Sequence, residues 1–174
     1  PHSVCVNRNG ERFVDEACSY DEFGMAMVAD QQATGANTPC WLVFDATFRS
    51  RYTAGGFMPT ALMPDWRISA DVWDHYLFRA ATLEALARKI HVPVDTLKQT
   101  IARMNGFART GVDEEFSRGG NDYDRMFGDP AVTPNPCLGA IETAPFYAVA
   151  INLGDLGTKG GLKADAAARV LDES

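Results

Sequence analysis

Residues 146–162 have the sequence FYAVAINLGDLGTKGGL. The segment from Phe146 to Ile151 is aromatic, β-branched or small, and this composition predicts a buried β-strand. The strand leads into a loop with four glycines, Thr158 and Lys159. Because glycine has no Cβ, such a loop lets backbone amides approach a cofactor, a phosphate or another strand closely. An ordinary tight turn between two strands is the alternative interpretation.

The loop does not match the two common phosphate-binding motifs. A Walker loop needs Gly-x-x-x-x-Gly-Lys-Ser/Thr, whereas Lys159 precedes the glycine pair and no hydroxyl residue follows that pair. The dinucleotide fingerprint Gly-x-Gly-x-x-Gly is also missing, because Gly154, Gly157 and Gly160 are spaced by threes. The chain therefore has no recognisable nucleotide-binding machinery of its own.

Length and composition indicate one ordinary globular domain. The chain has 174 residues, of which 46% are hydrophobic and 22% are charged. Its net charge of −7 argues against nucleic acid or an anionic membrane surface as the main partner. The sequence contains no apolar run of membrane-spanning length and no signal-peptide pattern, so we expect a cytoplasmic protein without a membrane-spanning segment.

The cysteines and the chain ends add two expectations. The four cysteines lie far apart without a Cys-x-x-Cys motif, which predicts scattered free thiols and no metal site. The chain opens on Pro1 and ends at Ser174, directly after a predicted strand from Arg169 to Leu171. We interpret it as an excised piece of a longer protein.

Local patterns predict the other elements. Asn9-Gly10 lies between two apolar segments and predicts a hairpin with a type I′ turn. The segment from Thr53 to Arg67 is irregular although rich in large apolar residues, and 113–136 is a polar, turn-rich excursion. Helices are predicted from Asp21 to Ala33, from Thr82 and from Asp95 to Arg109, and a strand from Trp41 to Asp45. Together these elements predict a single α+β domain over residues 1–174.

Tyr52 is the side chain with the most chemical interest. It follows the strand at 41–45, stands beside Arg49 and Arg51, and precedes the apolar loop. Burial would raise the pKa of this phenol, whereas the neighbouring cations would lower it toward that of a usable general base. A core or rim tyrosine whose hydroxyl meets a backbone carbonyl is the alternative.

Several strings occur in the order found in one known family. They are Asn9 to Glu16, Phe44-Asp45 with Arg51-Tyr52, Thr82 to Ala87, Asn105 to Ala108, Gly111 to Asp113, Phe116 to Gly119, Gly128 to Pro130, Pro134 to Pro136, and Pro145 to Gly161. Together they resemble the capping, or substrate, domain of FAD-dependent 3-oxosteroid dehydrogenases, in the flavoprotein superfamily that includes fumarate reductase. In that family the capping domain is inserted in an FAD-binding domain, and the active site lies between the two.

The resemblance implies roles for individual residues. Tyr52 resembles the tyrosine that helps to remove a proton next to the steroid ketone, while a hydride passes from the adjacent carbon to the flavin. Gly157, Thr158, Lys159, Gly160 and Gly161 resemble the loop that passes close to the isoalloxazine ring. The apolar loop would suit a flat hydrophobic substrate, with ordinary packing as the alternative, and its candidate lining residues are Phe57, Met58, Met63 and Trp66.

The same resemblance places most FAD contacts outside this chain. FAD would be held mainly by the missing domain, so the isolated chain is expected to bind no FAD tightly and to be inactive. The full-length protein would be an FAD-dependent oxidoreductase acting on CH–CH groups, and its partners would be the FAD-binding domain of the same polypeptide and an apolar small molecule.

A fumarate-reductase-like enzyme acting on unsaturated carboxylates is the rival interpretation. That branch resembles His-Thr-Met-Gly-Gly in the flavin-facing loop, with the histidine on a substrate carboxylate, but this chain has Gly157 there. The acid-binding arginine of that branch also lacks a match in residues 17–20. Because a dicarboxylate needs paired cations, these departures favour the steroid-like interpretation. A module that only binds, without catalysis, is the third possibility.

Overall fold

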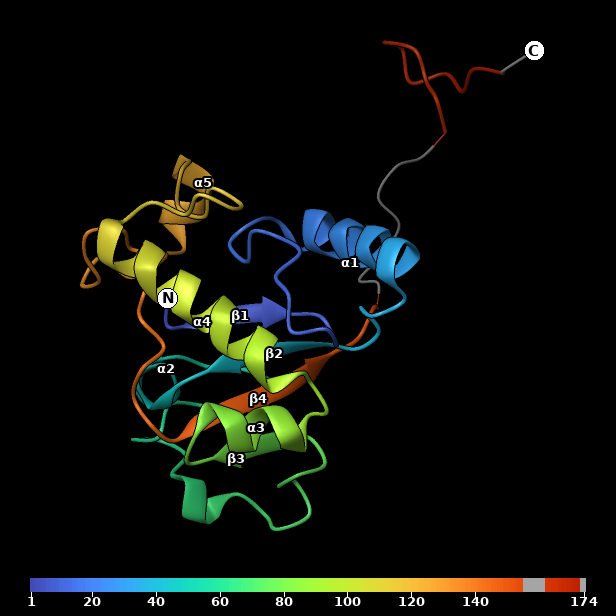
Figure 1. The fold of residues 1–174 in the computed structure, drawn as a ribbon. Coiled ribbons are helices and arrows are strands. Elements are labelled where there is room, and N and C mark those ends of the chain that lie inside the picture. The colour runs from blue at the N-terminus through green and yellow to red at the C-terminus, as the bar shows by residue number, and fades with distance from the viewer. Residues whose placement is uncertain (155–161, 173–174) are drawn as a thin grey trace.

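A computed structural model describes residues 1–154 and 162–172 of the chain. Figure 1 shows a small sheet with helices around it. The strands are β1 (Ser3–Val6), β2 (Cys40–Phe44), β3 (Leu77–Ala80) and β4 (Phe146–Ile151). The helices are α1 (Tyr20–Thr34), α2 (Ala46–Arg51), α3 (Leu83–Lys89), α4 (Val94–Thr110) and α5 (Asp122–Met126), with a 3₁₀ turn at Asp65–Arg67. The predicted α+β class is confirmed.

The four strands form one antiparallel sheet in the order β1-β2-β4-β3. β4 is the strand predicted at 146–151, and it lies between β2 and β3. Phe44 of β2 pairs with Tyr147 of β4, and Ala80 of β3 pairs with Phe146 of β4. All three strand pairs of the described residues are antiparallel, whereas dinucleotide-binding folds are built on parallel strands.

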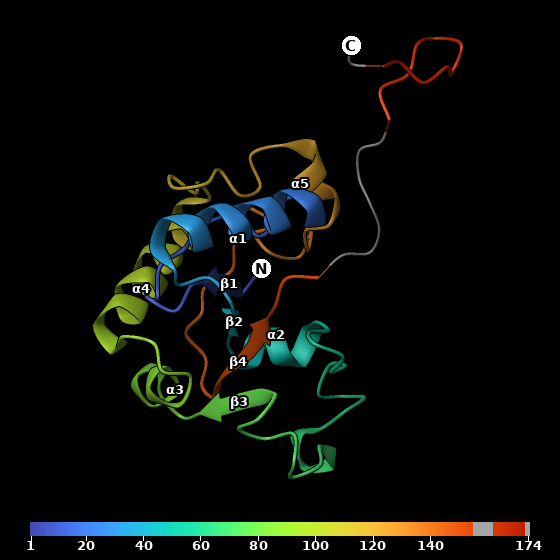
Figure 2. The same cartoon turned by 90° about the vertical axis from the view of Figure 1, so that its right-hand side faces the viewer.

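Alternation along the strands divides the core into two layers. Successive side chains of a strand point to opposite faces, so each strand supplies both layers. The layer beneath α3 and α4 takes Trp41, Val43, Phe146 and Ala148. The opposite layer, beneath α2, takes Leu42, Phe44, Tyr147 and Val149. Figure 2 shows α3 and α4 on one side of the sheet and α2 on the other.

Helices α3 and α4 form where the sequence predicts them. The Thr82 hydroxyl accepts from the Ala85 amide at 3.2 Å and caps α3. Gly111 ends α4 in the left-handed conformation, at φ +80°. Leu97, Ile101 and Met104 are buried against the sheet, and burial of such side chains stabilises the fold by about 1.5–3 kcal/mol each.

Helix α1 is also confirmed, but it buries little apolar surface. Ser19 caps it in a capping box with Glu22, and Gly35 ends it at φ +68°. Met27 is buried, whereas Met25 and Val28 are 60% and 42% exposed. Within the described part of the chain, no helix combines the length and apolar character needed to cross a membrane.

The predicted hairpin at Asn9-Gly10 is wrong. β1 pairs with β2, and residues 11–14 form no strand. The dipeptide does make a local turn, in which the Gly10 amide donates to the Asn7 carbonyl at 3.0 Å. The next residues leave the sheet because Arg12 carries its guanidinium into a buried cluster of carboxylates. Turn chemistry therefore fixed the bend but not the strand partner.

Four further local features differ from the expectations. α2, β3 and α5 occupy segments for which the sequence predicted no element. Residues 169–171 form no strand, because only a single bridge joins Ala164 and Val170. α2 and α5 have six and five residues, too few to carry a periodic pattern. β3 is recognisable only through its pairing with β4.

The four cysteines are free, as predicted.

Candidate active site

Tyr52 lies at the C-terminal cap of the short helix α2. Asp45 caps the N-terminus of this helix, and its buried carboxylate accepts from the Phe48 amide at 3.0 Å. The same carboxylate accepts from the amides of Glu142 and Thr143 at 3.1 and 2.9 Å. These bonds fix α2 between the end of β2 and the segment before β4. The ring of Tyr52 then packs on Phe48, with ring centroids 5.2 Å apart.

The Tyr52 hydroxyl donates a hydrogen bond of 2.5 Å to Oδ2 of Asp129. The sequence allows two alternatives for this phenol, a base with a lowered pKa or a hydroxyl on a backbone carbonyl. The structure shows neither, because the acceptor is a carboxylate. Burial and Asp129 raise the pKa of Tyr52 to about 12, against a smaller opposite effect of Arg51. The hydroxyl is therefore protonated at neutral pH.

The second arginine beside Tyr52, Arg49, organises the apolar loop. Its side chain is 2% exposed, and Nη2 donates to the carbonyl of Met63 at 2.6 Å. Nη1 donates to the carbonyl of Met58, and Nη2 also pairs with Asp65 at 3.2 Å. Asp65 in turn accepts from Tyr147 at 2.7 Å and pairs with Arg79 at 3.2 Å. One buried guanidinium thus holds both ends of segment 58–65.

The four predicted lining residues have different surroundings. Phe57 is partly buried next to Tyr76, with ring centroids 5.7 Å apart, and it packs on the layer beneath α2. Met63 is partly buried, Met58 is 45% exposed and Trp66 is 83% exposed. Trp66 lines a shallow hollow of about 370 Å³ together with Trp73 and Arg79. The structure brings the four residues onto one anchored loop, not into one closed pocket.

The predicted flavin-facing residues, Gly157 to Gly161, lie outside the described residues. The described helices offer no replacement site for the FAD pyrophosphate. Four helices are capped at their N-termini by their own side chains, from Ser19, Asp45, Thr82 and Asn121. The fifth, α4, carries the Gly10 turn against its first turn, where a Cβ on Gly10 would lie 3.1 Å from the Leu97 amide. The N-termini of the described α-helices therefore do not fit the phosphate part of FAD.

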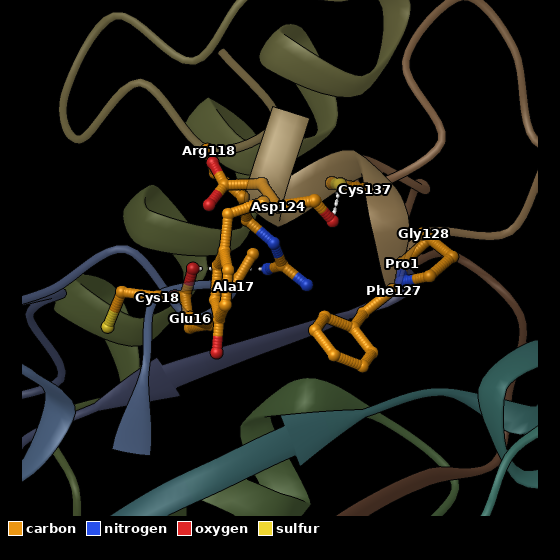
Figure 3. A pocket seen from close by; sticks show the side chains of 10 residues that line it. Pro1, Glu16, Ala17, Cys18, Arg118, Asp124, Phe127, Gly128 and Cys137 are labelled. Carbon is orange, nitrogen blue, oxygen red and sulfur yellow. Dashed lines mark hydrogen bonds and ion pairs between the residues drawn. The ribbon is translucent and has the colours of Figure 1, made fainter. Parts of the chain in front are cut away.

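A separate polar pocket of about 250 Å³ was missed by sequence reasoning (Figure 3). Arg118 donates to the Ser3 carbonyl at 2.9 Å and to Glu16 at 3.1 Å. Cys137 donates to the carbonyl of Asp124 at 3.1 Å. Burial raises the pKa of Cys137 and also of Cys18, the latter to about 11, so both thiols stay protonated. The two thiols of this pocket are therefore not activated as nucleophiles.

Asp129 is the functional candidate that the sequence did not reveal. It occurs in the Gly128-Asp129-Pro130 string, which contributes to the resemblance but has no role attached to it. Separation in sequence hides the contact, because the two partners are 77 positions apart. Only the path of the chain after α5 carries this carboxylate to the end of α2.

Comparisons with known proteins agree with this architecture. The sequence model described as "FAD binding domain" matches residues 1–174. A 3-oxosteroid 1-dehydrogenase of Mycolicibacterium smegmatis is 43% identical over 98% of this chain and 30% of its own length. A 4-oxocyclohexanecarboxylate 2-dehydrogenase of Sinomonas cyclohexanicum is 42% identical over 99% of this chain and 29% of its own length.

A solved structure shares the whole fold. The crystal structure of a 3-ketosteroid delta1-dehydrogenase from Sterolibacterium denitrificans, in complex with 1,4-androstadiene-3,17-dione, superimposes with a TM-score of 0.91 at 44% identity. The match covers 99% of this chain and 30% of that one. The chain thus spans less than a third of the length of the relatives that it matches.

Proposed function

The chain belongs to the FAD binding domain family, and from this membership we propose that it forms the substrate-binding part of a dehydrogenase acting on a cyclic ketone. FAD is the cofactor of this family and supplies a hydride acceptor when bound. The activity is assigned to a full-length polypeptide, since the chain spans only 30% of the 3-oxosteroid dehydrogenase.

The proposal extends to the domain organisation. We assign residues 1–174 to a single capping domain inserted in an FAD-binding domain. The antiparallel order β1-β2-β4-β3 supports this assignment, because a sheet of this kind lacks the parallel crossovers on which dinucleotide sites are built. The capped helix N-termini support it as well.

The phenol of Tyr52, next to the loop that Arg49 anchors, is the observation that carries the proposed reaction. A proton on the carbon next to a ketone is acidified by the carbonyl, and a positioned hydroxyl with a basic partner can remove it. Tyr52 has such a partner in Asp129. The apolar side chains of segment 57–66 give the ring system of the substrate a surface to lie on.

The names of two relatives support a ketone in a six-membered ring as the substrate. Their names share this group, in one case within a steroid and in the other on a cyclohexane carboxylate. Exposed Met58 and Trp66 favour the larger apolar substrate, a 3-ketosteroid. Dehydrogenation would introduce a double bond next to the ketone.

Turnover by the full-length protein tests this function. A dye-reduction assay should compare a 3-ketosteroid, 4-oxocyclohexanecarboxylate and fumarate at equal concentrations. We expect reduction of the dye with a ketone, and fastest with the steroid. Turnover of fumarate without turnover of either ketone would establish the fumarate-reductase-like function instead. Binding of the steroid without any turnover would indicate a module that binds without catalysis.

The isolated chain has its own test. We expect residues 1–174 alone to bind no FAD tightly in a fluorescence titration, because the described helices offer no pyrophosphate site. Stoichiometric FAD binding by the isolated chain would contradict the proposed division of labour between the two domains.

A further inference from the structure

We propose that Asp129 is the proton acceptor behind Tyr52: it takes the hydroxyl proton of Tyr52 while Tyr52 removes the proton next to the substrate ketone. The proposal rests on the proposed function and assigns that site a second group. Its basis is the hydrogen bond of 2.5 Å from the Tyr52 hydroxyl to Oδ2 of Asp129. This distance lies at the short end for an O–H donor on a carboxylate.

The loop around Asp129 holds the carboxylate in place before any substrate binds. Oδ1 accepts from the Ala131 amide at 2.8 Å, so only Oδ2 is turned to Tyr52. The backbone of Asp129 is fixed as well, since its amide donates to the Pro136 carbonyl at 3.0 Å and its carbonyl accepts from Val132 at 2.9 Å. A fixed acceptor costs no reorganisation when the proton moves.

The charges around Tyr52 and Asp129 favour a neutral phenol on an ionised carboxylate, and proton transfer begins from this state. The hydrogen bond from Tyr52 is the main cause that lowers the pKa of Asp129, and Arg51 acts in the same direction. Arg51 also faces the Tyr52 phenol. At neutral pH the pair is therefore a neutral phenol on an ionised carboxylate. A phenol in this state has to give up its own proton when it accepts another.

A second tyrosine–carboxylate pair in the same domain shows what distinguishes this one. Tyr147 donates to Asp65 at 2.7 Å, but Asp65 also pairs with the guanidinium groups of Arg49 and Arg79. The charge of Asp65 is thus shared with two guanidinium groups. Among the ion pairs of residues 1–154 and 162–172, none includes Asp129. The negative charge of the Asp129 carboxylate therefore remains available to accept a proton.

The proton step balances without any further reagent. The C–H bond next to the ketone breaks, and its proton bonds to the Tyr52 oxygen. The O–H bond of Tyr52 breaks at the same time, and that proton bonds to Oδ2 of Asp129. The electron pair of the C–H bond becomes the enolate of the substrate, so one negative charge leaves Asp129 and one appears on the substrate. An aspartate removes a comparable proton in enzymes that isomerise ketosteroids.

Hydrogen exchange at the substrate tests the step apart from oxidation. The full-length protein, without electron acceptor, is incubated with a 3-ketosteroid in D₂O, and deuterium at the carbon next to the ketone is followed by mass spectrometry. We expect Asp129→Asn to slow exchange by about 100-fold, because the amide cannot take a proton. Asp129→Glu should recover part of the rate, and the surface variant Glu114→Gln should exchange like the wild type.

Two readouts separate the relay from a merely structural contact. In the wild type, exchange should fall in acid as Asp129 becomes protonated, with an apparent pKa below that of an ordinary aspartate. Asp129→Asn should lack this fall of the exchange rate in acid. The same variant should also have a lower pKa at Tyr52, which is measured from the phenolate absorbance with Tyr52→Phe as the blank. Exchange by Asp129→Asn at the wild-type rate would overturn the relay while leaving ketone turnover intact. Failure of the wild type to turn over or exchange any ketone would overturn the relay and the proposed function together.

Discussion

The guanidinium of Arg12 and the carboxylate of Asp113 form a bidentate pair, with N–O distances of 3.0 and 2.9 Å, although 101 positions separate them in sequence. The side chains are 1% and 0% exposed. Arg12 also binds Glu16 at 2.9 Å, and Glu16 accepts from Arg118 at 3.1 Å. This cluster ties the segment after β1 to the loop after α4.

Arg12→Ala should destabilise the chain by about 3–5 kcal/mol, because it leaves Asp113 buried without its cation and Glu16 with Arg118 alone. Urea unfolding at neutral pH measures the change. Arg109→Ala is the matched control, since Arg109 pairs with Glu142 at 3.3 Å with both side chains exposed. The control should cost less than about 1 kcal/mol. Equal costs for the two variants would show that burial of the cluster contributes nothing.

Acid should weaken the fold through Asp113. Burial raises the pKa of Asp113, but hydrogen bonds from Arg12 and from backbone amides outweigh burial and lower it below the ordinary value. A lowered pKa in the folded state means that the contribution is complete above the unfolded value of about 3.9 and is lost as pH falls through the folded value. The urea midpoint of the wild type should fall in this range. Asp113→Asn should start from a lower midpoint and lack this component.

Two glycines that end helices should respond differently to alanine. Both have positive φ, +80° at Gly111 and +68° at Gly35. A Cβ on Gly111 would lie 2.7 Å from Cγ of Pro134, whereas a Cβ on Gly35 meets nothing within 4 Å. Gly35→Ala should therefore cost about 1 kcal/mol of backbone strain alone. Gly111→Ala should cost about 2–3 kcal/mol by thermal or urea unfolding, and a smaller loss than in Gly35→Ala would contradict the contact with Pro134.

Arg49→Lys should weaken substrate binding more than it slows the chemical step. An ammonium group cannot reach the carbonyls of Met58 and Met63 and the Asp65 carboxylate with the geometry of a guanidinium. Loosening of segment 58–65 should raise KM of the full-length enzyme for a 3-ketosteroid by about tenfold, with a smaller change in kcat. Arg67→Lys, on an exposed residue of the same loop, is the control. An unchanged KM in Arg49→Lys would remove the loop from substrate binding.

Tyr52→Phe should lower kcat of the full-length enzyme by about 100-fold or more, because it removes the hydroxyl on which proton transfer depends. The flavin content, measured by its visible absorbance, should not change. Tyr123→Phe, which alters a half-exposed tyrosine on α5, should behave like the wild type. Activity of Tyr52→Phe at the wild-type level would exclude this phenol from the mechanism.

The sequence alone determined the elements whose pattern is local. The alternating strand at 146–151, the capped helix after Thr82 and the periodic helix that ends at Gly111 all follow from neighbouring residues, and the structure has each of them. The order of the motifs identified the family. Tyr52 could be singled out because it stands beside cations and an apolar loop in the sequence itself.

The tertiary structure decided which distant segments meet. Asn9-Gly10 favours a hairpin, yet β1 pairs with β2, because burial of Arg12 among carboxylates takes the following residues away from the sheet. Two arginines stand next to Tyr52 in sequence, but Arg49 points into the apolar loop and a remote aspartate receives the phenol. Pairing partners, the sign of a pKa shift and the second group of the candidate site depend on distances through space, and a linear pattern does not contain those distances.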